Sequence, residues 1–257
     1  MKKLIIPIIT IFLMSCSASV SNYYQVFKTV PENGTLSKDK IVFEDSNCIV
    51  SYNLWADGGE IGFSIYNKTD SDLTLDLSKT FYILNGIAYE YYQKRTFSMS
   101  SSSGTTLTSY PYYNNWNWYQ TKVSGTNTSS FETSFEEKTE RIIPPNSLIN
   151  VSEFHVSNSL YENCDLSKYP SSNKIKTVKF EKSNSPFVFY NLISYKIKSE
   201  NKRMENKFYV SEVTNVPSTA IVNYTYKNEC GVESIYGKAV FNNVTPDKFY
   251  IQYKYNY

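Results

Sequence analysis

The sequence predicts an all-β protein with sandwich-like packing, and three observations support this. The 257-residue chain contains 24 Tyr and 15 Phe but only 13 Leu, and aromatic side chains favour strands over helices. Short segments alternate between apolar and polar residues and are separated by brief turns, which is typical of half-buried strands. No apolar pattern holds a helical period over several turns. The length allows one large β domain or two small ones.

Residues 1–15 have the pattern of an export signal. Lys2 and Lys3 form a positive region, and residues 4–14 are an uncharged, mainly apolar run. A run of about eleven residues suits a signal peptide and is shorter than the roughly 20 residues that a transmembrane helix needs. We therefore expect these residues to direct export rather than to span a membrane.

The sequence Leu13-Met14-Ser15-Cys16 resembles the bacterial lipobox. This resemblance implies that Cys16 is lipidated, that the chain is cleaved before it, and that acyl chains such as palmitate anchor the protein, because two or more chains hold a protein stably in a bilayer. Residue 17 is Ser rather than Asp, so nothing favours the inner membrane, and we expect a lipid anchor in the outer membrane. The alternative is cleavage after Ala18 and a soluble product.

Cleavage before Cys16 changes the charge and the cysteine count. It removes Lys2 and Lys3 and leaves 24 basic and 24 acidic residues. A neutral balance indicates no attraction to nucleic acid. Three cysteines remain in an oxidising compartment. Cys48 lies on the apolar face of an alternating segment, so Cys164 and Cys230 are the preferred disulfide pair, although other pairings stay open.

The first part of the mature chain predicts a tether and then a β-sandwich. Residues 16–40 carry few strong signals beyond a short strand at 23–30, and we interpret them as a tether. Alternating segments then fill residues 41–156. Asn85 and Gly86 separate two of them and predict a type I′ hairpin, whose turn needs positive φ at both central residues.

An insertion of about residues 94–138 interrupts this region. Between residues 96 and 131, 22 residues are Ser, Thr, Asn or Gly, and Lys122 is the single charge. Such a stretch predicts a loop or a floppy hairpin outside the core. It contains the run YPYYNNWNWY, whose exposed rings are the candidate ligand-binding residues: Tyr112, Tyr113, Trp116, Trp118 and Tyr119.

Residues 157–257 predict a second β region, packed on or beside the first. A turn-rich bridge over 158–173 precedes a long alternating strand from Phe187 to Ile197. Segments 208–213 and 221–226 follow. The last strand places Phe249, Ile251, Tyr253, Tyr255 and Tyr257 on one face.

Several of these segments carry a family resemblance. They are YNLWADGGEIGFSIYNKTDSDLTLDLSKTFYILNGIAYEYY, RIIPPNSLINVSEF, YENCDLSKYP, SPFVFYNLISYKI, KFYVSEVTNVP and DKFYIQYKY. Together they resemble a group of Bacteroidales envelope lipoproteins of unknown function. The first, with its Asn-Lys-Thr turn and Asn-Gly hairpin, is similar to immunoglobulin-like domains of bacterial envelope proteins. The resemblance implies an immunoglobulin-like β-sandwich and an envelope location, and it transfers no catalytic residues.

Catalytic and metal sites are weakly supported. His155 is the only histidine, so every Ser-His or Cys-His mechanism would need it, and its segment indicates a sheet surface. Asp57 with Glu60, and Asp70 with Asp72, are better explained as turn residues than as cation ligands. The chain has no CxxC pair and no phosphate-binding Gly loop, so we expect no catalytic residues, metal or cofactor.

These observations favour a non-enzymatic lipoprotein with a binding or structural role at the envelope. Its partners would be the membrane, through the anchor, and a glycan or an envelope protein. The alternative is a carbohydrate-binding surface lipoprotein that uses the loop around Trp116 and Trp118. An enzyme is the third class of function, and it would need polar groups that converge in a pocket.

Overall fold

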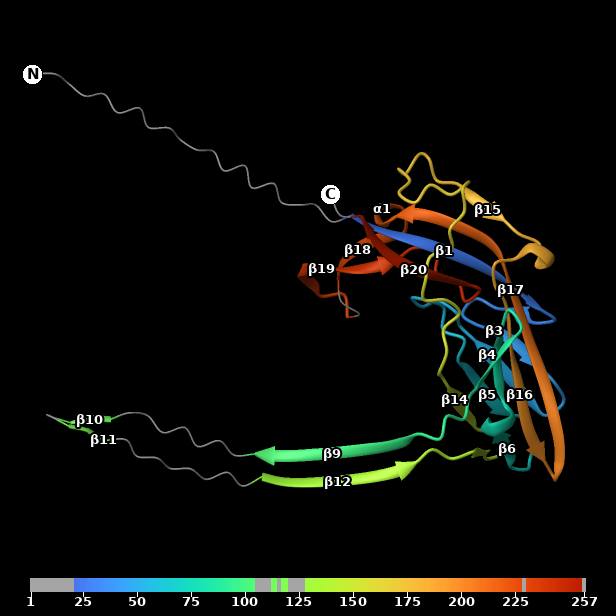
Figure 1. The fold of residues 1–257 in the computed structure, drawn as a ribbon, viewed down its shortest axis with the longest axis horizontal. Helices are drawn as coiled ribbons and strands as arrows, with labels where there is room; N and C mark the ends of the chain where they lie inside the picture. The colour runs from blue at the N-terminus through green and yellow to red at the C-terminus, as the bar shows by residue number, and fades with distance from the viewer. Residues whose placement is uncertain (1–20, 105–111, 115–116, 120–127, 228–229, 256–257) are drawn as a thin grey trace, which may run out of the picture.

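The computed structural model describes residues 21–104, 112–114, 117–119, 128–227 and 230–255. Its largest sheet has nine antiparallel strands. Six follow the order β13-β6-β16-β17-β1-β20, while β7 pairs with β16, β8 pairs with β7 and β15 pairs with β17. Figure 1 shows the long strands β1, β16, β17 and β20 of this sheet. The strands of this sheet are β1 (Ser21–Glu32), β6 (Leu73–Asp76), β7 (Phe81–Leu84), β8 (Ile87–Glu90), β13 (Glu140–Ile143), β15 (Thr177–Lys179), β16 (Val188–Ile197), β17 (Glu200–Pro217) and β20 (Lys248–Tyr255).

A second sheet has five strands in the order β14-β5-β4-β3-β2. They are β2 (Thr35–Leu36), β3 (Ile41–Glu44), β4 (Cys48–Tyr52), β5 (Phe63–Asn67) and β14 (Leu148–Val151). It packs against the large sheet, because the Phe208 ring of β17 lies 5.2 Å from that of Tyr52 and 5.3 Å from that of Phe43. The all-β prediction with sandwich-like packing is therefore confirmed, and the immunoglobulin-like topology stays a prediction.

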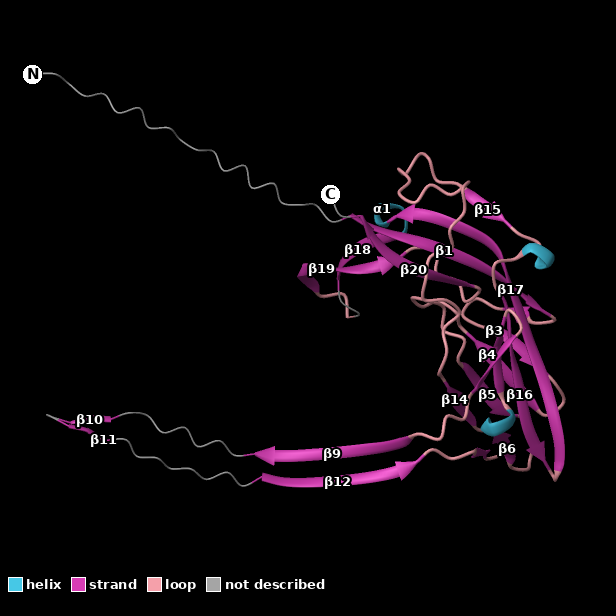
Figure 2. Cartoon of the chain, viewed as in Figure 1, coloured by secondary structure: helices cyan, strands magenta, loops and turns pink. Residues whose placement is uncertain are grey.

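The remaining elements are short or lie apart from the two sheets (Figure 2). Helical turns are confined to η1 (Leu77–Lys79), η2 (Lys182–Asn184) and α1 (Ser218–Ile221) within the described residues. Three ladders have two strands each: β9 (Thr96–Gly104) with β12 (Thr128–Glu136), β10 (Tyr112–Asn114) with β11 (Asn117–Tyr119), and β18 (Val222–Lys227) with β19 (Glu233–Phe241).

The predicted tether is wrong for residues 21–32, which form β1 inside the large sheet; the short strand predicted at 23–30 lies within β1. β1 pairs with β17 on one side and β20 on the other. Phe27 is fully buried, and its ring stacks on that of Phe249 at 4.5 Å. The strand also buries the polar side chains of Gln25 and Thr29. These two polar residues weaken the apolar alternation, which explains why the segment looks like a tether in the sequence.

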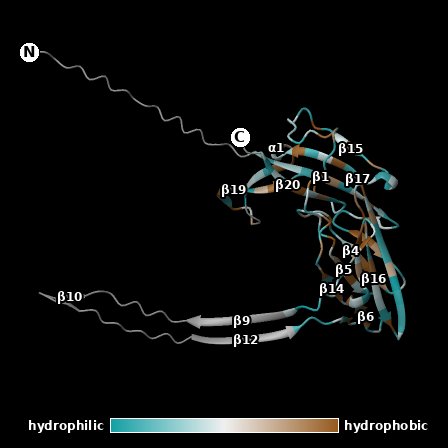
Figure 3. Ribbon diagram, in the orientation of Figure 1, coloured by the Kyte–Doolittle hydropathy of each residue, from teal (hydrophilic) through white to brown (hydrophobic). Residues whose placement is uncertain are grey.

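One hydrophobic core joins the two predicted regions 41–156 and 157–257. Val50 of β4, Ile193 of β16 and Phe249 of β20 belong to the same buried cluster, and each has 0% exposure. Strands β6 and β7 pair with β16, so the large sheet itself crosses the predicted boundary. Hydrophobic colour follows β4, β5 and β16, whereas β9 and β12 are close to neutral (Figure 3). The body is therefore a single folding unit.

Two glycine-containing turns show how the sequence determines the strand ends. Asn85 and Gly86 have φ values of 49° and 84°, so the predicted Asn-Gly hairpin between β7 and β8 is confirmed. Gly59 has a φ of 77°, and a Cβ placed there would lie 2.7 Å from the Phe249 ring. A side chain at position 59 would thus meet both backbone strain and a clash.

A buried polar network connects the two sheets. Asn206 donates to the Tyr52 hydroxyl at 2.8 Å, and Asn191 donates to the same oxygen at 3.3 Å. Asn191 also donates to the Ile61 carbonyl at 3.0 Å and accepts from the Tyr91 hydroxyl at 3.0 Å. Burial raises the pKa of Tyr52 and of Tyr91, so both hydroxyls stay protonated and can donate or accept hydrogen bonds. The network links strands β16 and β17 of the large sheet to Tyr52 of the second sheet through buried hydrogen bonds.

Candidate functional site

The insertion forms a projecting arm, which we define as residues 96–136. β9 and β12 pair antiparallel over nine residue pairs, from Thr96–Glu136 to Gly104–Thr128. Among the described strands, these two pair with each other alone, and Figure 1 shows them leading away from the body. The prediction that the insertion lies outside the core is confirmed, and its base is a regular antiparallel ladder.

The aromatic run lies on the second ladder of the arm. β10 and β11 place Tyr112 opposite Tyr119 and Tyr113 opposite Trp118. Four of the five predicted ligand-binding residues are therefore two cross-strand pairs of one ladder. Trp116 lies outside the described residues.

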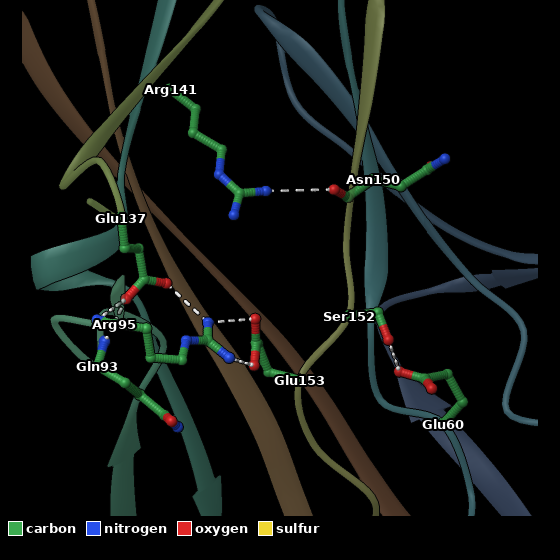
Figure 4. Close-up of polar contacts among 8 residues, drawn as sticks. All are labelled: Glu60, Gln93, Arg95, Glu137, Arg141, Asn150, Ser152 and Glu153. Atoms are coloured by element: carbon green, nitrogen blue, oxygen red, sulfur yellow. Dashed lines mark hydrogen bonds and ion pairs between the residues drawn. The ribbon is translucent and has the colours of Figure 1, made fainter. Parts of the chain in front are cut away.

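The root of the arm is a charge cluster that the sequence analysis missed. The Arg95 guanidinium donates through Nη1 and Nη2 to the two carboxylate oxygens of Glu153, both at 2.6 Å, and through Nη2 to Glu137 at 2.7 Å (Figure 4). Glu137 also accepts from the backbone amides of Gln93 and Arg95 at 3.0 and 3.2 Å. Arg95 and Glu137 precede and follow the arm, so this cluster ties both of its strands to residue 153 on the body.

Burial and hydrogen bonding act in opposite directions on the root. The Glu137 side chain is only 2% exposed, and burial alone would raise its pKa. The hydrogen bonds from Arg95 and from the two amides outweigh burial, so the pKa of Glu137 lies below its usual value. The hydrogen bonds that Arg95 donates to Glu153 and Glu137 raise the pKa of Arg95. Both Arg95 and Glu137 are thus charged at neutral pH.

An aromatic platform, defined as Tyr82, Tyr89 and Phe154, lies close to the root. Tyr82 stacks on Tyr89 at 6.0 Å and on Phe154 at 5.4 Å between ring centroids. Tyr89 is 41% exposed. Phe154 directly follows Glu153 of the root, and β8, which carries Tyr89, lies a few residues before Arg95. The platform therefore lies at the base of the arm.

Two clefts flank the platform and share Tyr89 and Phe154. One has a volume of about 480 Å³ and presents polar groups from Glu153, His155 and Asn158. The other has a volume of about 530 Å³ and is lined by Tyr92, Gln93 and Lys94. Aromatic walls with a few polar groups at the rim are the usual composition of a small-ligand site. Chemically, such rings can stack on the apolar face of a sugar while the rim hydrogen-bonds its hydroxyls.

His155 lies on the surface, as the sequence predicts. Its side chain is 45% exposed, and Nε2 lies 3.9 Å from a carboxylate oxygen of Glu60. Glu60 also accepts from the Gly62 amide at 3.0 Å and from the Ser152 hydroxyl at 2.9 Å (Figure 4). Asp57 accepts from the Gln252 amide at 3.3 Å. Glu60 therefore accepts one hydrogen bond within its own turn and one from a distant segment, and Asp57 accepts from β20. Across the described residues, no three His, Cys, Asp or Glu side chains gather as a metal site.

The cysteines follow the prediction in one case only. Cys48 is fully buried, and burial raises the pKa of its thiol. Cys164 is exposed and forms no disulfide, so the predicted Cys164–Cys230 bridge is absent. The physical reason is placement: Cys164 lies in the segment between β14 and β15, whereas Cys230 lies between β18 and β19. Cys16 lies outside the described residues.

The root residues left one signal in the sequence. Arg95 and Glu137 flank residues 96–136, in which Lys122, Glu132 and Glu136 are the charged residues, so opposite charges at both ends of a charge-poor insertion could have indicated a clamp. Glu153 carried no such signal, because its contact with Arg95 depends on where the fold places the segment that follows β14. Tyr89 and Phe154 were also missed, since their neighbours in sequence do not show that their rings meet.

The fold and site define an all-β protein with sandwich-like sheets, a projecting arm and an aromatic platform at its base. Comparisons of this chain with protein-family models, with curated proteins and with solved structures find no match. In the part of the chain that the structure describes, no helix has the length and apolar character to cross a membrane.

Proposed function

We propose that the protein is an outer-membrane lipoprotein, anchored through Cys16, with a non-catalytic binding role at the cell envelope. The signal-like residues 1–15 and the Leu-Met-Ser-Cys sequence support the anchor. The folded body begins at Ser21, only five residues after Cys16, so an acylated Cys16 would hold the body close to the membrane. The chemistry requires Cys at this position because its thiolate forms the thioether to the lipid.

Labelling with radioactive palmitate tests the anchor. The wild-type chain, produced in a bacterium with lipoprotein processing, should carry label and accumulate as an unprocessed precursor when globomycin blocks the lipoprotein signal peptidase. Cys16→Ser should lose the label and leave the membrane fraction. Cys164→Ser is the matched control and should behave as wild type. Membrane retention of Cys16→Ser would contradict the proposal.

The observation that supports a binding role is the aromatic platform beside the Arg95–Glu137–Glu153 cluster at the root of the arm. A partly exposed Tyr89 and two clefts that flank the platform offer a ring face and polar groups at one place on the body. His155 carries the only imidazole of the chain. It is exposed, and its Nε2 lies 3.9 Å from a carboxylate oxygen of Glu60. These features suit recognition better than chemistry.

Carbohydrate is the second, more specific candidate, because flat rings beside amide and carboxylate groups fit the two kinds of surface on a sugar. A glycan array should show binding by wild type and loss with Trp116→Ala/Trp118→Ala. Tyr89→Ala should weaken binding roughly tenfold, equal to about 1.4 kcal/mol of contact. Tyr224→Ala, which truncates an exposed Tyr on another hairpin, is the matched control. Absence of glycan binding by the wild type would contradict this candidate.

A further inference from the structure

The hairpin of β18 and β19 exposes large apolar side chains to an unusual degree. Tyr224 is 66% exposed, Tyr226 57%, Ile235 89% and Tyr236 79%. Contiguous exposed apolar surface on a soluble domain marks a contact with a protein or a membrane. The hairpin pairs with no third strand among those described, so these side chains lie on a two-stranded ladder outside both sheets.

Most of these exposed apolar residues share one face of the hairpin, while Lys227 pairs with Glu233 nearer the turn. Tyr224 lies opposite Ala239, and Tyr226, two residues later, lies over Gly237, whose Cβ would be 3.1 Å from the Tyr226 ring. Ile235 shares the face of Gly237 and Ala239, because side chains alternate along a strand. Tyr236 belongs to the opposite face. The hairpin therefore combines exposed rings with a charged pair near its turn, and such an amphipathic surface suits the interface between water and lipid.

The base of the hairpin is held at the N-terminal end of β1. Phe241, the last residue of β19, packs its ring 5.4 Å from Tyr24 of β1, 5.3 Å from Trp55 and 4.9 Å from Tyr250. β17 ends at Pro217, which pairs with Tyr23, and α1 leads directly from there into β18. Figure 1 shows the hairpin beside the end at which the chain enters β1.

A second group of tyrosines surrounds the same end of β1. Tyr169 lies 5.2 Å from Tyr23, 6.0 Å from Tyr253 and 4.4 Å from Tyr255, measured between ring centroids. The Lys168 ammonium lies 5.9 Å from the Tyr169 ring. Tyrosine is enriched where an apolar interior meets water, because its ring is apolar and its hydroxyl is polar. Lysine can extend its charge toward lipid headgroups from the same position.

We propose that the end of the β18–β19 hairpin, with Tyr224, Tyr226, Ile235 and Tyr236, inserts into the headgroup region of the bilayer that holds the protein. This inference rests on the lipid anchor proposed above. An extended chain covers at most about 3.5 Å per residue, so Ser21 would lie within about 18 Å of an acylated Cys16. The anchor thus brings this end of the body, rather than the sheet edge at β13, to the lipid surface.

Hydrogen exchange on the full-length protein tests the contact. The acylated chain is reconstituted in vesicles of phosphatidylethanolamine and phosphatidylglycerol and compared with Cys16→Ser in solution, while mass spectrometry records the acyl groups on Cys16. Amides of residues 222–241 should exchange about tenfold more slowly in the vesicles. Tyr224→Ser/Tyr226→Ser/Ile235→Ser/Tyr236→Ser should remove that slowing. Ile142→Ser/Leu148→Ser, at exposed apolar positions of β13 and β14, is the matched control and should keep it.

The outcomes separate the contact from the anchor. An acylated chain whose residues 222–241 exchange as fast as in solution would overturn the contact and leave the anchor standing. Absence of acyl groups on Cys16 would overturn the anchor and the contact together. Slowing in solution that grows with the concentration of Cys16→Ser would show that the hairpin pairs with a second copy of the chain, and would overturn the membrane assignment.

Discussion

Two hairpins leave the body of this protein, and they are attached by different chemistry. The arm of β9 and β12 is fixed by the ion pairs of Arg95 with Glu137 and Glu153. The β18–β19 hairpin is fixed by Phe241 among Tyr24, Trp55 and Tyr250. The first root depends on charge and the second on ring packing. A protein can therefore carry two projecting elements whose attachment responds to different conditions.

The largest effect should come from Arg95→Ala, because it leaves the nearly buried Glu137 without its cation. Removing one partner of a buried pair typically costs 3–5 kcal/mol, and since Arg95 is 32% exposed we expect about 3 kcal/mol. Urea unfolding measures this loss, and limited proteolysis should show faster cleavage near residues 93–96 and 136–138. Arg141→Ala is the matched control, since Arg141 makes one long hydrogen bond, at 3.5 Å, to Asn150. Equal stability of both variants would contradict the clamp.

Phe241→Ala should have the next largest effect and should act on the other hairpin. Truncating a fully buried Phe costs about 3–5 kcal/mol, and Phe241 is half-buried, so about 2 kcal/mol is expected. Hydrogen exchange should speed up over residues 222–241, and Trp55 fluorescence should change because its ring lies 5.3 Å from Phe241. Val240→Ala, at an exposed neighbouring position, should leave both signals unchanged. If Phe241→Ala instead speeds up hydrogen exchange in the arm, the two hairpins are not attached independently.

The attachment of the arm should weaken in acid, and the attachment of the β18–β19 hairpin should weaken in alkali. Glu137 has a lowered pKa in the fold, so its contribution is complete above the unfolded Glu value of about 4.3 and is lost as pH falls through the lower folded value. Burial raises the pKa of Tyr24 and of Tyr250. Their contribution is complete below the unfolded Tyr value of about 10 and is lost as pH rises through the higher folded values.

Exchange rates at the two roots, followed from acid to alkaline pH and corrected for intrinsic exchange, measure this difference. We expect local opening at residues 93–96 and 136–138 to increase in acid, because protonated Glu137 no longer holds the Arg95 guanidinium as an ion pair. Opening at residues 222–241 should increase in alkali. Glu137→Gln should abolish the acid response of the arm root and leave the alkaline response of the hairpin. A shared pH response at both roots would show that they open together.

The sequence predicted the body better than its attachments, for a physical reason. Alternation at Cys48 to Leu54 and the Asn85-Gly86 turn are local signals, and both are confirmed. β1 was mistaken for a tether because its place between β17 and β20 depends on partners about two hundred residues away. Arg95 and Glu153 are separated by 58 positions, and no periodicity links them. Local patterns specify strands, whereas long-range contacts decide which strands become core and which side chains form a site.

The smallest effect on stability should come from Trp118→Ala in the arm. Its ladder pairs with no other strand among those described, and substitutions away from a packed core usually change stability by less than about 0.5 kcal/mol. Thermal unfolding of Trp118→Ala should therefore match that of wild type, with Phe249→Ala in the core as the destabilised reference. If Trp118→Ala lowers the stability of the body as much as Arg95→Ala, the aromatic ladder packs against the body. The arm would then be a structural element whose rings are unavailable to a ligand. Unchanged stability with lost glycan binding would instead assign the rings of the arm to recognition.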